Sequence, residues 1–477
     1  MDLRKLTACQ VAEVVTSGEI TAYQLIEETL ERCKVVNDKL NTFMHIADNE
    51  ALEQAAVVDK MVKTGLKLPL AGVPVAVKDD LCSSALPTTF GSPAFKNFRS
   101  PYSAAVVDKL LDAGAVVLGK TNLDDLSMGS TAATSYIGPA LNPWIADRVA
   151  GSAGAAAVAA GQCLIAIGSD SSGALRQGAS HCGVFGLRPT MGRVSRYGLS
   201  MASSSFGQVG VTAASTEDIL IALEVISGSD IRDASTTVYR ENSAEGSHKQ
   251  VPTEIKIGYS SSYLDLLDLD HQIIQDQAMK KVKSDGYQLV DLRLDLLAEG
   301  LRAYYVIAMA EASSNHSRYD GIRFGVAADV ENLDQLYSKS RSLTFGREAR
   351  RRSIFGTFIL NHGSYDRYYR QALKVWNLVR RGFETALDQC DLLLLPVVRN
   401  LPHAAAEQVE FLRLYEEDIF CAPVSMTGLP ALTLPAGELN QIPVGMQLVG
   451  RPFSEKLLLS TAYRLTPEIR LPPNGIY

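Results

Sequence analysis

The sequence predicts an α/β protein whose sheet is covered by helices on both faces. In "LAGVPVAVKDD" at 70–80, valines fall inside an apolar run that ends in charge, which is typical of a buried strand. The segment "SAAVVDKLLDAGAVVLGKTN" at 103–122 has the pattern of a helix, a glycine turn and a strand, and "GAAAVAAGQCLIAIGSD" at 154–170 repeats that order. Helices that alternate with buried strands indicate a sheet packed between two helical layers.

The composition is typical of a large, soluble globular chain. The 477 residues are 46% apolar and 21% charged, and the net charge of −7 gives no general nucleic-acid footprint. Seven scattered cysteines without a C-x-x-C pair indicate reduced thiols and argue against a disulfide framework or a thiolate zinc site. The N-terminus lacks the apolar segment of a signal peptide, and the apolar run at 154–168 is too short to span a bilayer. We therefore expect a cytoplasmic protein, or one of an organelle matrix after removal of a targeting segment.

Along the chain we expect a single domain over residues 1–477. Apolar residues at helical spacing predict two helices within 7–36, and helices are also expected over 270–292, over 301–318 and in a basic region at 345–388. The regions of the domain are N-terminal helices at 1–60, a core at 61–228, a polar, turn-rich linker at 228–254, a strand and helical cap region at 255–390, and C-terminal sheet strands at 391–477.

Common catalytic and nucleotide-binding motifs are absent from the sequence. The chain has no G-x-x-x-x-G-K-[ST], no strand-linked G-x-G-x-x-G, no H-E-x-x-H and no G-x-S-x-G, and its seven histidines do not cluster at metal-ligand spacing. Lys78 ends the apolar run "VPVAV" and is the candidate base, because burial disfavours the charged form of a lysine. Taken alone, the residue is better explained as a strand-end lysine that reaches solvent.

Ordered blocks over nearly the whole chain resemble a known family. They include "AGVPVAVKDD", "TNLDDLSMGS", "GSDSSGALRQGASHCGVFGLRPTMGRVSRYGL", "RYDGIRFG" and "PVGMQLVGRPF". These blocks are similar to those of the amidase signature enzymes, and most of all to the branch formed by the A subunits of glutamyl-tRNA(Gln) amidotransferase. The resemblance implies the amidase signature fold, in which a large mixed β-sheet of about ten strands is covered by helices on both faces, with a helical cap near 300–390.

The resemblance also implies a catalytic triad, most of which this chain lacks. Family members hydrolyse amides with a nucleophilic serine, a second serine in a cis peptide and a lysine. Lys78 matches the lysine, but the nucleophile position in "GSDSSGALR" is Ala174. The stretch "RVAGSAGAAAVAAG" is three residues shorter than the family pattern. The second serine therefore falls on Ala150 when the pattern is aligned from the right, and Ser152 is the nearest hydroxyl when it is aligned from the left.

Other positions in the same blocks also depart from the family pattern. Ser171 and Ser172 are candidate substitutes for the nucleophile, in a loop whose backbone amides, with Gly173, would form the oxyanion hole. Gly207 stands where the family has an acid, and Gly178 stands where it has a proline. These departures lie close to the expected catalytic residues, so we expect all of them to reflect a single loss of catalytic function.

The positions that would hold glutamine are better retained. The resemblance implies an acid, an arginine and a tyrosine around the α-amino and α-carboxylate groups of the ligand, and an arginine can clamp a carboxylate with two hydrogen bonds. The matching residues are Asp418 for the acid, Arg351 for the arginine with its neighbours Arg350 and Arg352 as alternatives, and Tyr304 or Tyr305 for the tyrosine.

By resemblance, the chain would hydrolyse glutamine and supply ammonia to a B-type subunit, which converts Glu-tRNA(Gln) to Gln-tRNA(Gln) with ATP and Mg²⁺ at its own site. A C-type subunit would lie between them, tRNA would be reached only through the complex, and neither a cofactor nor a metal is expected in this chain. Because the nucleophile is missing, we expect an impaired or inactive copy. Alternatives are an active amidase that uses Ser172 or Ser171 with Lys78, a structural subunit of another assembly, and an artificially altered member of the A-type branch.

Overall fold

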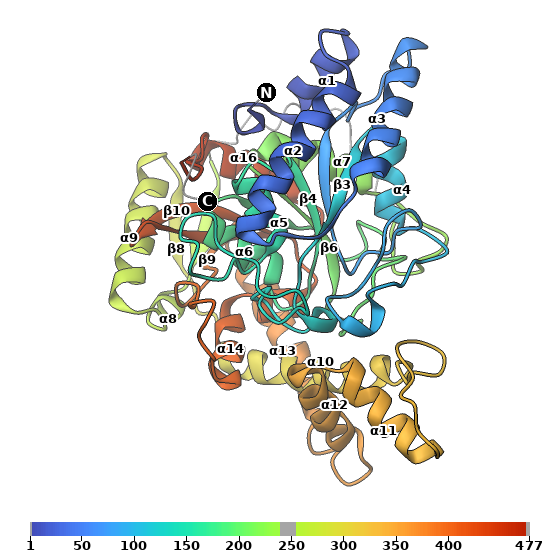
Figure 1. The fold of residues 1–477 in the computed structure, drawn as a ribbon. Helices are drawn as coiled ribbons and strands as arrows, with labels where there is room; N and C mark the ends of the chain where they lie inside the picture. Colours follow the sequence, from blue (N-terminus) through green and yellow to red (C-terminus); the bar gives the residue numbers. More distant parts are fainter. Residues whose placement is uncertain (1, 239–253, 474–477) are drawn as a thin grey trace.

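The fold is built on one mixed sheet with helices on both faces (Figure 1). The computed structural model describes residues 2–238 and 254–473, and within them the sheet has eleven strands. The strands are β1 (Phe43–Ile46), β2 (Pro74–Lys78), β3 (Val116–Thr121), β4 (Ile165–Asp170), β5 (Phe185–Arg188), β6 (Gln208–Ala213), β7 (Lys256–Tyr259), β8 (Gln288–Asp291), β9 (Leu392–Pro396), β10 (Ala431–Leu439) and β11 (Ile442–Gly450). They lie in the order β1-β3-β2-β4-β6-β5-β10-β11-β9-β7-β8, which confirms the predicted mixed sheet.

The helices cover this sheet and form a lobe at one end of it (Figure 1). The α-helices are α1 (Ala8–Thr16), α2 (Ala22–Leu40), α3 (Asp48–Lys63), α4 (Ala105–Asp112), α5 (Ala153–Ala159), α6 (Ala174–Cys182), α7 (Thr216–Ile226), α8 (Ser261–Leu264), α9 (Leu269–Ser284), α10 (Leu297–His316), α11 (Leu333–Thr344), α12 (Arg347–Leu360), α13 (Tyr369–Leu387), α14 (Phe411–Glu417), α15 (Ala422–Thr427) and α16 (Glu455–Leu465). Short 3-10 helices are η1 (Leu3–Lys5), η2 (Pro93–Phe95), η3 (Asp125–Ser127) and η4 (Asp418–Phe420).

The centre of the sheet contains the units that the sequence predicts. The segment at 103–122 forms α4, a turn at Gly114 with φ of +88°, and β3. The segment at 154–170 lies within α5, a turn at Gly161 with φ of +69°, and β4. Strand β2 pairs in parallel with both β3 and β4, so the carboxyl ends of these three strands meet at one edge of the sheet.

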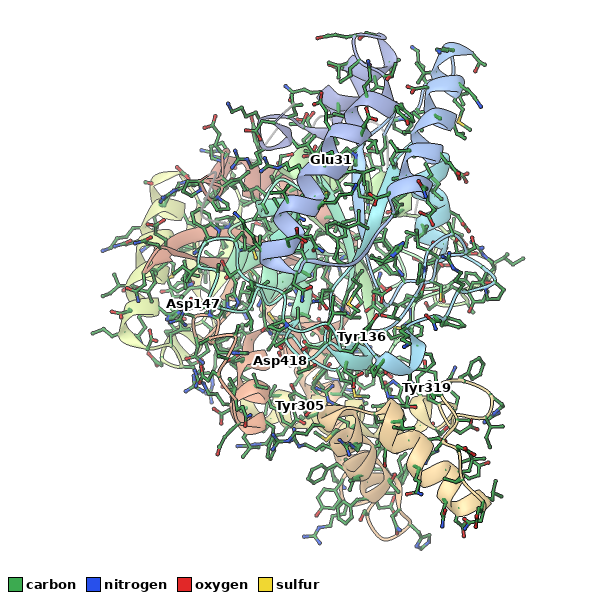
Figure 2. All side chains as sticks on the ribbon, in the orientation of Figure 1. Glu31, Tyr136, Asp147, Tyr305, Tyr319 and Asp418 are labelled. Carbon is green, nitrogen blue, oxygen red and sulfur yellow. The ribbon has the colours of Figure 1, made fainter. Side chains whose placement is uncertain are left out.

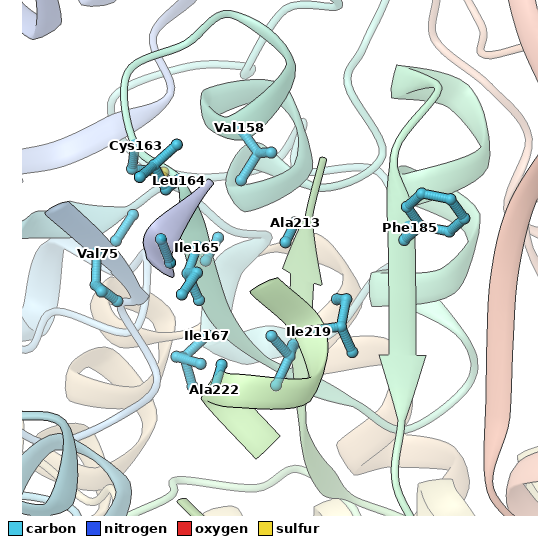
Figure 3. Packing of buried hydrophobic residues seen from close by; sticks show 14 of the residues in the cluster. Val75, Val158, Cys163, Leu164, Ile165, Ile167, Phe185, Ala213, Ile219 and Ala222 are labelled. Atoms are coloured by element: carbon cyan, nitrogen blue, oxygen red, sulfur yellow. The ribbon is translucent and has the colours of Figure 1, made fainter. Parts of the chain in front are cut away.

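Buried aliphatic side chains hold the helices to the central strands (Figure 3). Ile165 and Ile167 of β4 belong to the same buried cluster as Val75 of β2 and as Ile219 of α7. Every residue of β3, β6, β9 and β11 is buried as well. Strands covered on both faces read as continuous apolar runs, which is why the sequence pattern identified this part of the fold.

The N-terminal and cap regions contain more strand than the sequence predicts. The two helices expected within 7–36 are α1 and α2, and a Thr–Gln capping box starts each of them. The region 1–60 also contributes β1, which pairs antiparallel with β3. The helix expected over 270–292 is α9, which is followed by strand β8. The predicted linker at 228–254 falls largely on residues 239–253, which lie outside the described residues.

A helical cap projects from one end of the sheet, as expected for 300–390 (Figure 1). Helix α10 packs on α12 and α13, and their buried side chains form a second apolar cluster with η4 and α15. The basic helical region at 345–388 consists of α12 and α13 with a turn between them. Among the described residues, no helix is both long and apolar enough to cross a membrane.

Candidate active site

Lys78 and Ser169 meet at the edge where parallel strands end. Lys78 is the last residue of β2, and Ser169 is the next-to-last residue of β4, which runs parallel to β2. Lys78 Nζ donates a hydrogen bond of 2.7 Å to Ser169 Oγ. Ser169 Oγ in turn donates to Asp80 Oδ2 at 2.5 Å, and Lys78 Nζ lies 3.1 Å from the same oxygen.

The Asp80 carboxylate is the anion of this cluster. Its side chain is fully buried, and its Oδ2 atom also accepts a 2.8 Å hydrogen bond from Ser127 Oγ of η3. Lys78 is thus the strand-end cation of an ion pair, an arrangement that the sequence pattern did not indicate.

Ala174 lies at the first position of α6, directly after the glycine-rich loop. Gly173 precedes it with φ of +123°, and a Cβ atom at Gly173 would lie 2.2 Å from Cys421 Cβ. Only glycine fits that position. The loop therefore has a tight glycine turn directly before the nucleophile position, whereas the side chain at that position is the methyl group of Ala174.

One small cavity joins the expected catalytic positions. Lys78, Ser152, Ser169 and Ala174 all line it, and its volume is about 30 Å³. A cavity of that size holds one or two water molecules, whereas sites for organic ligands typically enclose about 300–1,000 Å³. The structure brings Lys78, Ser152 and Ala174 together around this small, partly open space.

The shortened segment places Ser152, and not Ala150, at this cavity. Ala150 is buried, and its backbone N–H donates to Ala140 O at 2.9 Å. Ser152 is the N-cap of α5, where its Oγ accepts a hydrogen bond of 3.4 Å from the N–H of Ala155. All peptide bonds of the described residues are trans. The Ser152 hydroxyl therefore serves the helix end.

Gly178 and the shortened segment are parts of one packing arrangement. A Cβ atom at Gly178 would lie 2.2 Å from Ser152 Cβ and 2.5 Å from Ser152 N. The turn at 150–152 thus lies directly on the backbone of α6. A Cβ atom at Gly207 would lie 2.4 Å from Met201 Sδ, a contact that the flexible methionine side chain can relieve. The close approach of the backbone therefore requires glycine at position 178.

Asp418 and Tyr305 are hydrogen-bonded where the sheet meets the cap (Figure 2). Tyr305 Oη donates to Asp418 Oδ2 at 2.6 Å, and Gln177 Nε2 and Ser130 Oγ donate to Oδ1 at 2.8 and 3.2 Å. Burial raises the pKa of Asp418, and hydrogen bonds from Tyr305, Gln177 and Ser172 oppose that effect. Groups of the chain itself therefore occupy both carboxylate oxygens.

Of the two candidate tyrosines, Tyr305 contacts the acid. Its ring stacks on Tyr415 with centroids 4.0 Å apart. Tyr304 is buried against Phe206 at 4.9 Å, and burial raises its pKa. Ser172 lies near enough to Tyr304 and Asp418 to lower the pKa of both groups. The candidate substitute nucleophile Ser172 is thus near the Asp418 cluster, whereas the serine hydrogen-bonded to Lys78 is Ser169.

Arg352 is the arginine of α12 that faces this cluster. Its guanidinium carbon lies 5.6 Å from the ring centroid of Tyr305, and its Nε donates to Glu348 Oε1 at 2.8 Å. Arg351 pairs with the same glutamate and lies 4.1 Å over the ring of Phe411, while Arg350 is exposed. Of the candidate arginines, Arg352 lies beside Tyr305, whereas Arg351 lies over Phe411.

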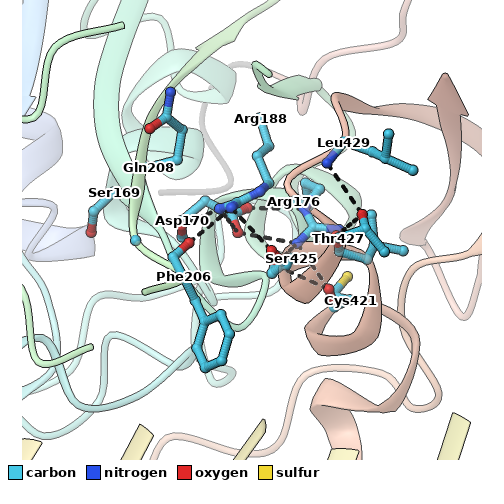
Figure 4. Close-up of polar contacts among 12 residues, drawn as sticks. Ser169, Asp170, Arg176, Arg188, Phe206, Gln208, Cys421, Ser425, Thr427 and Leu429 are labelled. Carbon is cyan, nitrogen blue, oxygen red and sulfur yellow. Dashed lines mark hydrogen bonds and ion pairs between the residues drawn. The ribbon is translucent and has the colours of Figure 1, made fainter. Parts of the chain in front are cut away.

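A buried ion-pair network holds the loop before α6 in place (Figure 4). Arg176 contacts Asp170 through Nε and Nη2, at 3.0 and 3.1 Å, and also donates to Gln447 and Ser425. Burial opposes ionisation of Asp170, but Arg176 and Arg188 outweigh burial and hold its pKa below the ordinary value. The network fixes the loop to β11 and α15 and contacts no part of the cavity at Lys78.

The partners that complete both clusters were not among the residues predicted from the sequence. Ser169 and Asp80 join Lys78, and Gln177 joins Asp418. The positions of Lys78 and Ser169 at the ends of two predicted strands were a usable signal for the first cluster. In the described residues, no group of three or more histidine, cysteine, aspartate or glutamate side chains is placed to hold a metal ion.

The fold and the Lys78 site define the class of the protein. The family model described as Amidase matches residues 24–459, and the chain belongs to that family. The A subunit of glutamyl-tRNA(Gln) amidotransferase from Natranaerobius thermophilus is 36% identical over 480 residues, which cover 100% of this chain and 98% of the relative. The protein of the same name from Methanosarcina mazei is 40% identical over 463 residues, with 96% and 95% covered.

A solved structure agrees with these sequence relatives. The crystal structure of the A subunit of glutamyl-tRNA(Gln) amidotransferase from Thermotoga maritima superposes with a TM-score of 0.81 at 31% identity, and the match covers 99% of this chain and 98% of that one. The fold is therefore that of the amidase signature enzymes, as the sequence predicts.

Proposed function

We propose that this chain is an A-type amidotransferase subunit that does not hydrolyse glutamine. Relatives named as A subunits of glutamyl-tRNA(Gln) amidotransferase match it over essentially its full length. The proposed loss of hydrolysis rests on Ala174, whose methyl group lies at the start of α6, beside the cavity that Lys78 lines. In this proposal the chain assembles with B- and C-type subunits, and any contact with tRNA is made through them.

The chemistry of the site supports a loss of hydrolysis. A methyl group cannot attack an amide, and Lys78 is engaged with Asp80 and Ser169. Removing one member of a catalytic triad typically costs several orders of magnitude in rate. The 30 Å³ cavity is small, and Gly151 and Ser152 of the turn at 150–152 line it, which supports a steric barrier to a substrate amide.

The retained acid supports weak binding of glutamine at most. An α-amino group at Asp418 would compete with the donors Gln177, Ser130 and Tyr305, which already contact the carboxylate. We propose that the Asp418 cluster now ties α6 to the cap. ATP and Mg²⁺ would act only at a partner B subunit. The seven free cysteines, six of them buried, support a reducing compartment such as the cytoplasm.

Ammonia release from glutamine tests the proposal. The chain is purified alone and with the B- and C-type subunits encoded in the same genome, and the Methanosarcina mazei relative serves as a positive control. We expect no release above the blank in either case, and complex formation in the second. Turnover comparable to that of the control, abolished by Lys78→Ala, would overturn the loss of hydrolysis.

One observation favours a second candidate function, hydrolysis by a relocated serine. Ser169 contacts both Lys78 and Asp80, so it has a proton acceptor within hydrogen-bond distance. Ser172 and Ser171 are the other serines of the loop. Parallel assays of Ser169→Ala, Ser171→Ala and Ser172→Ala distinguish these cases, because only the variant that lacks the working nucleophile would lose turnover.

A further inference from the structure

Helix α12 buries one of its faces against the other helices of the cap. Ala349, Arg352, Gly356 and Ile359 are buried and follow each other at spacings of three and four residues. A Cβ atom at Gly356 would lie 2.0 Å from Met309 O, so the helix contacts the backbone of α10 directly. This inner face accounts for the position of α12 in the fold.

The opposite face of α12 carries three exposed apolar side chains, and the chain itself covers only part of it. The ring of Phe358 lies 5.6 Å from that of Tyr368, and Arg351 lies over Phe411. Ile354, Phe355 and Phe358 are 70%, 47% and 53% exposed. Helical spacing puts them on the same side as Arg347 and Arg351, opposite the buried residues. A helix that is apolar on two opposite faces is typical of an element buried between partners.

Exposed apolar side chains are concentrated around this helix. Among the described residues, 24 large apolar side chains are exposed, and 11 of them lie within 322–365. Singly scattered exposed apolar residues are normal, but clusters of this kind mark interaction sites. The lobe that carries them projects from the sheet at the end opposite α1 (Figure 1).

The charge of this lobe indicates the chemistry of its partner. Residues 322–365 contain seven lysines and arginines and four acids, a net charge of +3 in a chain whose total is −7. Arg347 and Arg350 are exposed in the first turn of α12. A second copy would bring the same positive face to a symmetric contact, so like charges would oppose self-association. An acidic partner is complementary.

We propose that the outer face of α12, defined as Arg347, Arg350, Ile354, Phe355 and Phe358, docks a helical segment of a partner protein. That segment presents apolar side chains at helical spacing with Asp or Glu at the end that meets Arg347 and Arg350. An aliphatic residue, Ile354, is the most exposed of the three apolar side chains, which favours a protein over a nucleic acid, since bases stack on aromatic faces.

The inference deepens the proposed function and rests on it, because the partners to be tested are the B- and C-type subunits encoded in the same genome. Binding of these subunits to the full chain is measured by biolayer interferometry. We expect the double variant Ile354→Asp, Phe358→Asp to weaken binding about 10- to 100-fold. The variant Arg347→Glu, Arg350→Glu should weaken binding too and reduce its salt dependence.

Val35→Asp is the matched control, since Val35 is 62% exposed on α2, away from the cap. It should bind as the original chain does. Circular dichroism checks that each variant is folded. Should the aspartate variant unfold, Ile354→Ala with Phe358→Ala replaces it, and slower amide exchange over 347–360 in the complex gives a second readout.

The remaining outcomes each count against a stated claim. A complex that forms equally well with all variants overturns this inference and leaves the proposed function intact. No complex with the B- and C-type subunits overturns the proposed function and this inference with it. Sedimentation that shows a dimer lost in the aspartate variant assigns the face to a second copy. Loss of tRNA binding alone in the Arg347→Glu, Arg350→Glu variant assigns it to RNA. Both last results overturn the inference.

Discussion

The Nζ atom of Lys78 lies 2.7 Å from the Oγ atom of Ser169, and both atoms contact the same carboxylate oxygen of Asp80. Ser127 of η3 donates to that oxygen as well. The cluster therefore joins the ends of β2 and β4 to η3. Lys78 Nζ, Ser169 Oγ and Asp80 Oδ2 contact one another, whereas Asp80 Oδ1 is buried without a hydrogen-bond partner among the described residues. Contacts that stay within the cluster suit a structural centre better than a base that awaits a substrate.

Replacement of Asp80 tests that structural role. Asp80→Asn leaves Lys78 without its counter-charge and weakens the contacts with Ser169 and Ser127, so we expect the free energy of unfolding to fall by about 1–3 kcal/mol. The control is Asp112→Asn at the exposed end of α4, which should change stability by less than about 0.5 kcal/mol. Urea unfolding measures both, and equal stabilities would contradict the structural role.

Gly178 should be intolerant of any side chain. Gly178→Ala places a methyl group against Ser152, and we expect a loss of about 1–3 kcal/mol in unfolding free energy. Gly382→Ala, in the helix α13 with nothing within 4 Å of the new methyl, should be neutral or stabilising by up to about 1 kcal/mol. Thermal unfolding compares the two. A tolerated alanine at Gly178 would show that the turn at 150–152 does not rest on α6.

Restoring the nucleophile alone should not restore hydrolysis. Ala174→Ser supplies a hydroxyl, but the cavity remains about 30 Å³ and Lys78 remains paired with Asp80. Since triad members act as a unit, we expect ammonia release within about tenfold of the background. A gain of about a hundredfold or more would mean that Ser152 or Ser169 completes the triad and that the shortened segment is no obstacle.

The junction between the core and the cap should respond to pH through Asp125. Asp125 Oδ2 accepts a 2.9 Å hydrogen bond from the N–H of Gly346, just before α12. Burial raises the pKa of Asp125 from 3.8 to about 7, with Asp124 adding to the rise and Arg350 opposing it. Because the pKa is raised on folding, the stabilisation is fully present below about pH 4 and is lost as the pH rises through about 7.

The variant Asp125→Asn isolates this effect, since an amide does not titrate. Between about pH 4.5 and 7.5, the original chain should lose about 2–4 kcal/mol more unfolding free energy than the variant. Urea unfolding at several pH values gives the comparison. Parallel pH profiles of the two proteins would show that Asp125 carries no excess proton in the folded state.

The fold could be predicted where buried strands and helices alternate. Strands β2, β3 and β4 each begin with an apolar run and end in polar or charged residues, so their pattern is strong. Strands β1 and β8 were missed because each has four residues, which is too few for an alternating apolar pattern to show. Strand β8 also begins soon after Gly286, so its sequence resembles the end of the preceding helix. Their pairing with distant strands decides their structure.

The site could be predicted in part. The resemblance identified Lys78, Ala174 and Asp418, whereas the partners Ser169 and Asp80 depend on the parallel register of β2 with β4. The choice between Arg351 and Arg352 depends on the rotation of α12, because one residue turns a side chain by about 100° around the helix axis. In the folded chain, Arg352 is the arginine that lies beside the ring of Tyr305.

Glutamine hydrolysis by the assembled complex is the most direct test of the central claim. Ammonia release is measured for the chain with its B- and C-type subunits, beside the Methanosarcina mazei relative with its own partners. We predict a stable complex whose ammonia release equals the blank and is unchanged in Lys78→Ala. Release that approaches the control and disappears in Lys78→Ala would contradict a non-hydrolysing role.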